Sequence, residues 1–324
     1  MPWSEGAGGR PKRRSFARDG KSSVQGSIYS ASSQACPRIS PERGKILRKH
    51  LMPEGPEIRR AADRLHEQLA GRRLESVWFA FPELAAEAGS LVGREVTAVD
   101  SWGKALLTRF DDGRVLYSHN QLYGVWKLHD AEREPDTERS LRVRLTAEGR
   151  SASLYSASDV SLWPAERLAE HPFLSRLGPD LLTHGVTPEQ AMARLREPRF
   201  VRRRLGGLLL DQAPFAGIGN YLRSEILFFA GLSPTARVAD LSAVRLQELA
   251  RTILAVTRQA YEQAGVTNRA EWAVAARRHG ESRRLSRFAV FERDGRPCHA
   301  CGTPIERRMV ASRRLYLCPS CQPD

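Results

Sequence analysis

The chain has no long hydrophobic run. None of its apolar stretches approaches the roughly 20 residues needed to cross a bilayer, and its first residues lack the continuous apolar core of a secretory signal. Hydrophobic residues nevertheless make up 41% of the 324 residues, too large a share for a disordered chain. The sequence therefore predicts a soluble protein of an interior compartment, long enough for two packed domains.

Acidic residues are too few to balance the basic ones. The chain has 51 Lys and Arg against 37 Asp and Glu, a net charge of +14, and its pI is about 10.2. The first 52 residues hold 11 Lys and Arg against 3 Asp and Glu, so +6 remains for the other 272 residues. Such an excess indicates either a solvated basic surface or a polyanionic partner such as nucleic acid.

Cysteine is also scarce, and four of the five cysteines lie in the last 27 residues. A disulfide framework would be spread along a small secreted chain, so this clustering indicates a metal site. Cys298-x2-Cys301 is followed after sixteen residues by Cys318-x2-Cys321. Two such knuckles close a tetrahedron without an open position, which predicts one structural zinc ion, with an iron–sulfur centre or a redox pair as alternatives. The eight histidines show no ligand spacing.

Residues 1–52 are predicted to form a disordered basic leader. They are rich in Gly, Ser, Arg and Lys and have no sustained apolar period, so they could not offset the entropy of ordering. The segment has features of an organelle transit peptide and of a nucleic-acid-binding arm. A third interpretation, which we favour, is that translation begins at Met52. Cys36 lies in this leader and is expected to be unpaired.

Residues 53–176 are predicted to form an antiparallel β-sandwich with a helix at its start, within an α+β fold. Ile58, Leu65 and Leu69 fall at helical spacing and Gly71 ends the helix. The period then changes to two, and Asp112-Gly113 indicates a two-residue hairpin. The expected strands span 94–101, 104–110, 114–119, 123–129, 141–147 and 153–157.

The second half of the chain is predicted to be helical. Residues 177–183 form a hinge, residues 184–287 a helix-two-turn-helix domain, and residues 288–324 a zinc finger with strands over 305–311 and 315–317. The expected helices span 187–196, 200–212, 220–231 and 241–264; residues 266–287 carry no firm prediction. Gly217 and Gly219 lie between two of these helices, and their free N–H groups at a helix start predict an anion cradle that could clamp a DNA backbone.

The segment Met52-Pro53-Glu54-Gly55-Pro56-Glu57 carries the most chemical information. If Met52 is the initiator and is removed, Pro53 offers a free secondary amine that can attack a sugar carbon and leave an iminium ion. At the start of a helix the dipole disfavours added positive charge, which keeps such an amine unprotonated. Glu54 is then a candidate proton donor. Proline and glutamate are also ordinary residues at the start of a helix.

These residues resemble the formamidopyrimidine-DNA glycosylase/endonuclease VIII superfamily, and its endonuclease VIII branch in particular. The resemblance runs from Met52 to the C-terminus, about 272 residues. The matching blocks are Met52–Ile58, Gly103–Leu107, Tyr117–Gly124, Leu209–Gln212, Gly217–Arg223 and the four-cysteine module.

The resemblance implies a role for each matching residue. Pro53 would form the Schiff base, Glu54 would be the general acid, and Lys104 would donate the proton for β-elimination. Arg313 would act in δ-elimination, although Arg314 beside it competes for that role. The remaining matches are a wedge that fills the gap left by a flipped nucleotide (Gln121, Leu122, Tyr123), two DNA-phosphate ligands (Arg176, Asn220), an acidic residue near the nucleophile (Glu57), and the zinc ligands Cys298, Cys301, Cys318 and Cys321.

The resemblance implies a monomeric bacterial DNA-repair enzyme of the cytoplasm and nucleoid. It would excise oxidised pyrimidines from double-stranded DNA and cut abasic sites by β,δ-elimination. The alternatives are specificity for oxidised purines and a DNA-binding protein without catalysis. The last arises because, behind a leader, the Pro53 nitrogen is an amide and not a nucleophile. The leader is therefore an upstream extension of the true start, a segment that is cleaved, or a block that leaves the full chain inactive.

Overall fold

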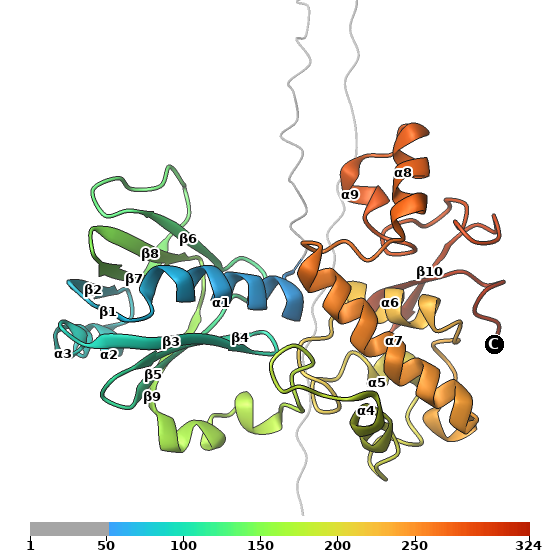
Figure 1. Ribbon diagram of the computed structural model, residues 1–324, viewed down its shortest axis with the longest axis horizontal. Coiled ribbons are helices and arrows are strands. Elements are labelled where there is room, and N and C mark those ends of the chain that lie inside the picture. Colours follow the sequence, from blue (N-terminus) through green and yellow to red (C-terminus); the bar gives the residue numbers. More distant parts are fainter. Residues whose placement is uncertain (1–51) are drawn as a thin grey trace, which may run out of the picture. The chain divides into compact units, whose positions relative to one another are not determined.

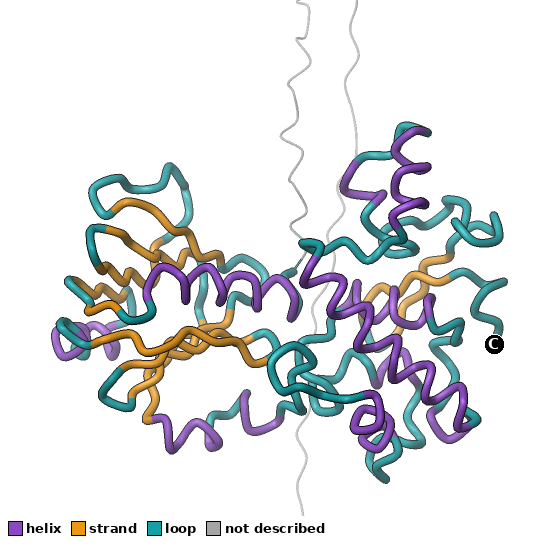
Figure 2. Tube along the Cα trace, in the orientation of Figure 1, coloured by secondary structure: helices purple, strands orange, loops and turns teal. Residues whose placement is uncertain are grey.

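The computed structural model describes residues 52–324, and its strands and helices gather in two different parts of that segment (Figures 1 and 2). The leader predicted over residues 1–52, with Cys36, lies outside the described residues except for Met52. The first part consists of α1 (Gly55–Leu69), β1 (Arg72–Arg73), β2 (Ser76–Phe79), α2 (Pro82–Ala85), α3 (Ala88–Leu91), β3 (Glu95–Trp102), β4 (Ala105–Phe110), β5 (Arg114–His119), β6 (Val125–Asp130), β7 (Leu141–Ala147), β8 (Arg150–Tyr155), β9 (Asp159–Pro164), η1 (Ala165–Glu170) and η2 (Leu174–Arg176).

Two antiparallel sheets form this first part, as the sequence predicts. One has the strand order β1-β3-β4-β5-β9 and the other β2-β7-β8-β6. Their inner faces bury a core that includes Val96, Leu116, Val143 and Leu154. The sequence patterns missed β1, β2 and β9. In β9 every residue is half-buried except Pro164, which is exposed. The strand therefore lacks the alternation of buried and exposed residues by which a strand is recognised in a sequence.

The hairpin between β4 and β5 differs from its prediction. Strand β4 ends at Phe110 and β5 begins at Arg114. Three residues, Asp111 to Gly113, therefore form the connection instead of two. Gly113 adopts a φ of 82°, which glycine reaches without steric cost. This is the three-residue loop with a left-handed glycine, the next most common way to join two antiparallel strands.

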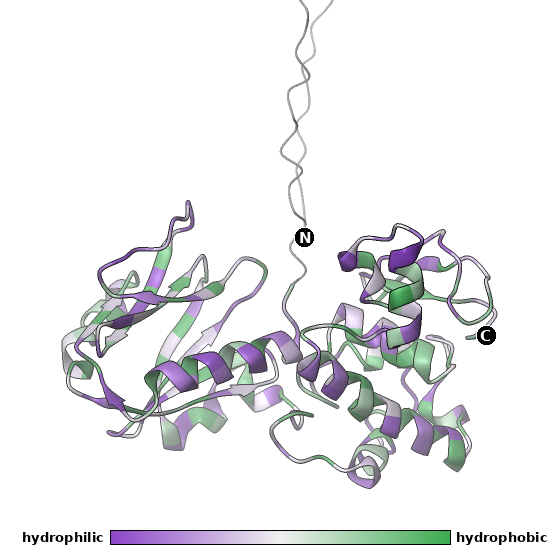
Figure 3. Ribbon diagram, turned by 45° about the horizontal axis from the view of Figure 1, so that its top comes forward, coloured by the Kyte–Doolittle hydropathy of each residue, from purple (hydrophilic) through white to green (hydrophobic). Residues whose placement is uncertain are grey.

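Helix α1 packs one face on the sandwich and leaves the other polar. Ile58, Ala62, Leu65 and Leu69 are buried, and hydrophilic residues dominate the visible side of the helix in Figure 3. Pro56 lies in the first turn, where its missing N–H leaves no partner unsatisfied. Figure 1 shows that the N-terminal end of α1 points from the sandwich toward the helical part of the chain.

The second part contains α4 (Pro188–Leu195), α5 (Leu205–Leu208), α6 (Asn220–Phe229), η3 (Val238–Asp240), α7 (Ala243–Glu262), α8 (Ala270–Arg278), α9 (Arg283–Ser286), β10 (Glu306–Val310) and β11 (Arg313–Leu317). The predicted capping box of α4 is present, because Thr187 and Gln190 exchange side-chain to backbone hydrogen bonds of 2.9 and 3.2 Å. None of the helices among residues 52–324 is long and apolar enough to span a bilayer.

The prediction of a helix over residues 200–212 was wrong. Only the single turn of α5 forms there, and its first N–H groups, on Leu205 and Gly206, donate to the carbonyls of Ala236 and Pro234. The paired glycines 206 and 207 lower the helical propensity of this apolar stretch. Gly206 is also packed so closely that a Cβ would lie 2.9 Å from the Pro234 and Val310 side chains.

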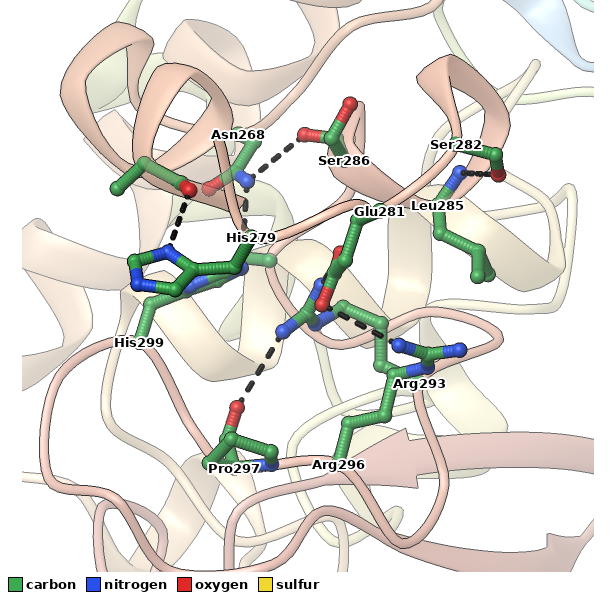
Figure 4. A network of polar contacts seen from close by, with 12 residues as sticks. Asn268, His279, Glu281, Ser282, Leu285, Ser286, Arg293, Arg296, Pro297 and His299 are labelled. Atoms are coloured by element: carbon green, nitrogen blue, oxygen red, sulfur yellow. Dashed lines mark hydrogen bonds and ion pairs between the residues drawn. The ribbon is translucent and has the colours of Figure 1, made fainter. Parts of the chain in front are cut away.

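Helices α8 and α9, for which the sequence offered no prediction, are tied to the cysteine-rich end of the chain. Figure 4 shows Glu281, just after α8, between Arg293 and Arg296. Arg293 is almost completely buried, so its pairing with Glu281 compensates the loss of hydration. Asn268 completes the connection by donating to the Ser286 carbonyl.

A buried carboxylate joins α6 to the segment that enters the cysteine module. Glu225 accepts hydrogen bonds from the backbone N–H groups of Ala289, Val290 and Phe291 at 2.8 to 2.9 Å and from the Thr267 hydroxyl at 2.6 Å. Each of these donors would be unsatisfied in the core without it.

We expect Glu225→Ala to lower the free energy of unfolding by about 3 kcal/mol or more, because it leaves several buried donors without an acceptor. Urea denaturation followed by circular dichroism measures the loss. Glu248→Ala removes an exposed carboxylate of α7 that pairs with Arg245 and should cost less than about 1 kcal/mol. Equal losses in both variants would contradict the assignment.

Candidate active site

Three glycines bring three segments of backbone together where the β-sandwich meets the helical part. Gly217, with a φ of 99°, would place a Cβ 3.2 Å from the Gly55 α-carbon and 3.6 Å from the Gly103 α-carbon. The Gly55 N–H donates to the Gly217 carbonyl at 2.8 Å. No larger residue at Gly217 could allow this approach. The start of α1, the β3–β4 turn and the loop before α6 therefore share one junction.

The carboxylate of Glu54 lies on the N-terminal end of α6. It accepts the backbone N–H groups of Gly219 and Tyr221 at 2.8 Å and of Leu222 at 3.2 Å. The positive end of the helix dipole favours an anion there. The anion cradle predicted at Gly217 and Gly219 thus exists, but it holds Glu54, and these three N–H groups are not free for a DNA phosphate.

Burial raises the pKa of Glu54 to about 7, with Glu57 adding to the rise and Lys104 and the backbone donors opposing it. The Lys104 ammonium donates to the Ile218 carbonyl at 2.9 Å. Burial also lowers the pKa of Lys104, while the nearby Glu54 raises it. Glu54 and Lys104 therefore form an acid–base pair in which the charge of each affects the pKa of the other.

Gln212 fixes the loop that both groups contact. Its side-chain amide donates to the Ile218 carbonyl at 2.8 Å, and its oxygen accepts the Gly217 N–H at 3.0 Å. Asp180, buried in the predicted hinge, fixes the β3–β4 turn by accepting the Gly103 N–H at 2.6 Å. Gln212 ends one of the blocks that carry the family resemblance but was assigned no role, and nothing in the sequence separates Asp180 from any other aspartate.

Glu57 lies one turn along α1 and faces the same junction. It accepts the backbone N–H of Glu54 at 3.0 Å and the Tyr221 hydroxyl at 3.1 Å. Pro53 precedes Glu54 and is half-buried. The predicted residues Pro53, Glu54, Glu57 and Lys104 are therefore brought together.

The hairpin of β10 and β11 approaches this cluster through a buried arginine. Arg223 donates to the Asn220 side-chain oxygen at 2.7 Å and to the carbonyls of Val310 and Arg314 at 3.2 and 3.3 Å. The Arg313 guanidinium is close enough that its charge helps to lower the pKa of both Lys104 and Arg223. Neighbouring strand residues point to opposite faces, so Arg313 and Arg314 do not both face the cluster.

The predicted wedge lies on the exposed loop between β5 and β6. Leu122 and Tyr123 are 40% and 62% exposed, which is unusual for large apolar side chains. Gln121 adopts a φ of 48° and accepts a hydrogen bond from Ser158 at 2.8 Å. These three residues are neighbours in the chain. Among residues 52–324, no hydrogen bond joins them to the Glu54 cluster.

Arg176 also lies apart from the Glu54 cluster. It is exposed at the end of η2 and lines a pocket of about 710 Å³. Arg194 and Arg199 line the same pocket, and Gln212 connects its wall to the loop before α6. The pocket offers several cations beside the hinge.

The four cysteines predicted from their spacing meet in space. The sulfur atoms of Cys298, Cys301, Cys318 and Cys321 lie within 4.8 Å of one another. Three of the separations are 3.4, 3.5 and 3.9 Å. Thiolates at about 2.3 Å from a tetrahedral zinc ion lie about 3.8 Å apart, so the arrangement fits a metal ion.

Comparisons with known proteins agree with this geometry. Residues 52–158 match the formamidopyrimidine-DNA glycosylase N-terminal domain, and residues 177–271 match the H2TH domain of the same proteins. The chain is 51% identical to "Endonuclease 8" of Pectobacterium carotovorum and 49% identical to that of Escherichia coli K12 over 271 residues. In both cases the match covers 84% of this chain and all of the relative.

Solved structures show the same fold. MutM (Fpg) of Thermus thermophilus superposes with a TM-score of 0.68 at 32% identity, covering 84% of this chain and 99% of that one. Lactococcus lactis Fpg bound non-covalently to DNA with an AP site gives a TM-score of 0.68 at 18% identity and covers 84% of this chain and 100% of that one.

The fold and the site define a DNA-repair glycosylase that also cuts abasic sites. The chain belongs to the formamidopyrimidine-DNA glycosylase and endonuclease 8 family.

We expect Gly219→Ala to reduce base release at least about 100-fold, the usual scale for losing a general acid. The new Cβ would lie 2.3 Å from the Glu54 carboxyl carbon and displace it from α6. Single-turnover assays on a damaged duplex measure the effect. Gly207→Ala is the control, because a Cβ there meets nothing within 4 Å; equal rates in the two variants would show that the position of Glu54 is unimportant.

Proposed function

We propose that this enzyme excises oxidised pyrimidines and cuts the resulting abasic site by β,δ-elimination, with Pro53 as nucleophile. One observation carries the proposal: Pro53 directly precedes a buried glutamic acid whose pKa is close to 7 and which is coupled to Lys104. These residues would serve as a nucleophile, a proton donor and a second proton carrier at one junction.

The reaction requires a defined set of bond changes. The free Pro53 nitrogen attacks C1′ of the damaged nucleoside; the bond from C1′ to the base breaks, and the base leaves with that electron pair and takes up the proton that the Pro53 nitrogen loses. The bond from C1′ to O4′ then opens as the nitrogen lone pair forms the iminium double bond; the electron pair of the broken bond goes to O4′, and Glu54 supplies the proton. The iminium ion makes C2′ acidic, so loss of a C2′ proton expels the 3′ phosphate with its bonding pair, and loss of the C4′ proton then expels the 5′ phosphate in the same way. Lys104 and Arg313 would assist these two eliminations.

This chemistry requires a free amine at residue 53. In a chain that retains residues 1–52 the Pro53 nitrogen is an amide, whose lone pair is delocalised. The active form therefore begins at Pro53. Two comparisons support this start: the family N-terminal domain matches from residue 52, and 84% of the chain covers the whole length of the endonuclease 8 relatives.

DNA contacts are proposed for the exposed residues outside the cluster. Leu122 and Tyr123 would enter the gap left by a flipped nucleotide, and Gln121 would face the orphan base. Arg176 and Asn220 would bind backbone phosphates. The basic pocket beside Arg176 supports this role, because Arg194 and Arg199 add positive charge to it.

The four-cysteine cluster would bind one structural zinc ion, which fixes the strands that carry Arg313. Four thiolate ligands leave no position for substrate, so the ion would stabilise the hairpin and would not catalyse. We propose further that the enzyme acts as a monomer on double-stranded DNA in the bacterial cytoplasm.

Borohydride trapping tests the nucleophile. We expect a chain that begins at Pro53 to form a covalent adduct with a thymine glycol duplex, and less with an 8-oxoguanine duplex. Pro53→Gly should reduce both trapping and nicking. Adduct formation by a chain that still carries residues 1–52 would contradict the proposal, and preference for 8-oxoguanine would favour the oxidised-purine specificity. Binding without any adduct would favour a non-catalytic DNA-binding protein.

The pH dependence of base release tests the general acid. Glu54 must be protonated to donate, and its pKa is about 7, so kcat/KM should fall about tenfold per pH unit above that value. Single-turnover kinetics between pH 5 and 10 measure the decline. Glu54→Gln should be slow and should lack this alkaline limb; a limb with the same midpoint in that variant would assign it to another group.

A further inference from the structure

Arg287 lies just after α9, where the chain enters the cysteine-rich part, and its backbone is held firmly. The Arg287 carbonyl accepts the N–H groups of Thr267 and Asn268, both at 3.0 Å. The carbonyl of the preceding Ser286 accepts the Asn268 side-chain amide at 2.9 Å, as Figure 4 shows. The direction in which the Arg287 side chain leaves the backbone is therefore fixed.

The Arg287 side chain reaches the active-site junction along a row of aromatic rings. Its guanidinium lies 4.4 Å from the centre of the Phe288 ring. The Phe288 ring packs against Tyr221 with ring centres 5.4 Å apart, and the Tyr221 hydroxyl donates to Glu57. The Nε of Arg287 is buried and has no hydrogen-bond partner.

Gly265 shows that Arg287 faces Glu57. This glycine follows α7 with a φ of 83°. A Cβ at Gly265 would lie 2.9 Å from Oε1 of Glu57 and 3.5 Å from Nη1 of Arg287. The carboxylate and the guanidinium therefore both lie beside the same bare α-carbon, in the space that a side chain at Gly265 would enter.

Glu57 is arranged to be an anion in a place that disfavours charge. The Glu54 N–H and the Tyr221 hydroxyl both donate to its oxygens, which suits a carboxylate. Burial raises the pKa of Glu57, whereas the hydrogen bonds from the Glu54 N–H and the Tyr221 hydroxyl and, to a smaller extent, the charge of Arg287 lower it. Two other charged groups face Glu57. One is Glu54, directly before α1, and the other is Lys104 on the β3–β4 turn, whose charge also acts on Glu54. The pKa of Lys104 is affected first by Glu54 and less by Glu57. Arg287, in contrast, acts on Glu57.

We propose that Arg287 is a positioning residue of the active site, which acts through Glu57 by adding to the groups that favour its ionised form beside Gly265. The inference rests on the proposed function, because its effect is on the nucleophile. An ionised Glu57 holds the Glu54 N–H, which belongs to the peptide that carries Pro53. Its negative charge also helps Glu54 to keep the proton that it donates. Loss of Arg287 would disturb both the orientation of Pro53 and the acidity of Glu54.

Kinetics of Arg287→Gln and Arg287→Lys test the role. In a chain that begins at Pro53 we expect the glutamine variant to lower kcat roughly 10- to 100-fold with little change in KM. The acidic limb of its pH profile should move to higher pH, because Glu57 then protonates more easily. Arg287→Lys should restore most of the rate and the profile. The matched control is Arg284→Gln, which changes an arginine of α9 that pairs with Glu292. This variant should behave as the wild type.

A stability measurement tests the pairing independently of catalysis. Arg287→Gln should lower Tm in the wild-type background and should lower it by less than half as much in a Glu57→Gln background. Equal Tm losses in both backgrounds would overturn the inference even if the enzyme is a glycosylase. Coupled Tm losses in a chain without base release would instead refute the proposed function and leave the pairing in place.

Two kinetic outcomes would overturn the inference. If Arg287→Gln weakens binding to an abasic-analogue duplex and reduces its salt dependence while kcat and the pH profile stay unchanged, Arg287 is a phosphate ligand. If rate, profile and binding all match those of Arg284→Gln, the residue has no part in the site.

Discussion

The placement of one carboxylate at the start of one helix organises this enzyme. Glu54 comes from the strand-rich half, whereas Gly219, Tyr221 and Leu222, which donate to it, come from the helical half. Burial opposes the ionised carboxylate and outweighs Lys104 and the backbone donors at the helix start, which favour it, so its pKa is raised to about 7. The same interaction thus joins the two halves, orients the first turn of α1 and supplies an acid that is half-protonated at neutral pH.

The parts that depend on local rules could be predicted from the sequence. Helix α1, the capping box at Thr187 and the meeting of the four cysteines follow from spacing and side-chain chemistry that need no knowledge of the rest of the fold. The antiparallel sandwich followed from alternation in most of its strands. Lys104 and Arg313 were identified by resemblance, and the charge of Arg313 helps to lower the pKa of Lys104.

The parts that depend on tertiary contacts could not be predicted. The stretch 200–212 has a helical pattern, yet Leu205 and Gly206 donate to Ala236 and Pro234, far along the chain, and only α5 forms. The anion for the Gly219 loop was expected from DNA, and no local pattern reveals that Glu54 occupies it. Arg287 lies in an arginine-rich segment, so nothing in the sequence distinguishes it from Arg283 or Arg284; only the packing of α7 on α1 brings Gly265, and with it Glu57, to its guanidinium.

The most direct test of this account is the titration of Glu54 itself. In protein labelled with ¹³C at the glutamate side-chain carboxyl carbons, the signal lost in Glu54→Gln identifies the residue, and its chemical shift can be followed between pH 4 and 9. The account predicts a midpoint close to 7, because burial outweighs the helix start and Lys104. A midpoint near the ordinary glutamate value of about 4.3 would show that Glu54 is an exposed anion at neutral pH, and the acid assigned to the sugar-opening step would have to be another group.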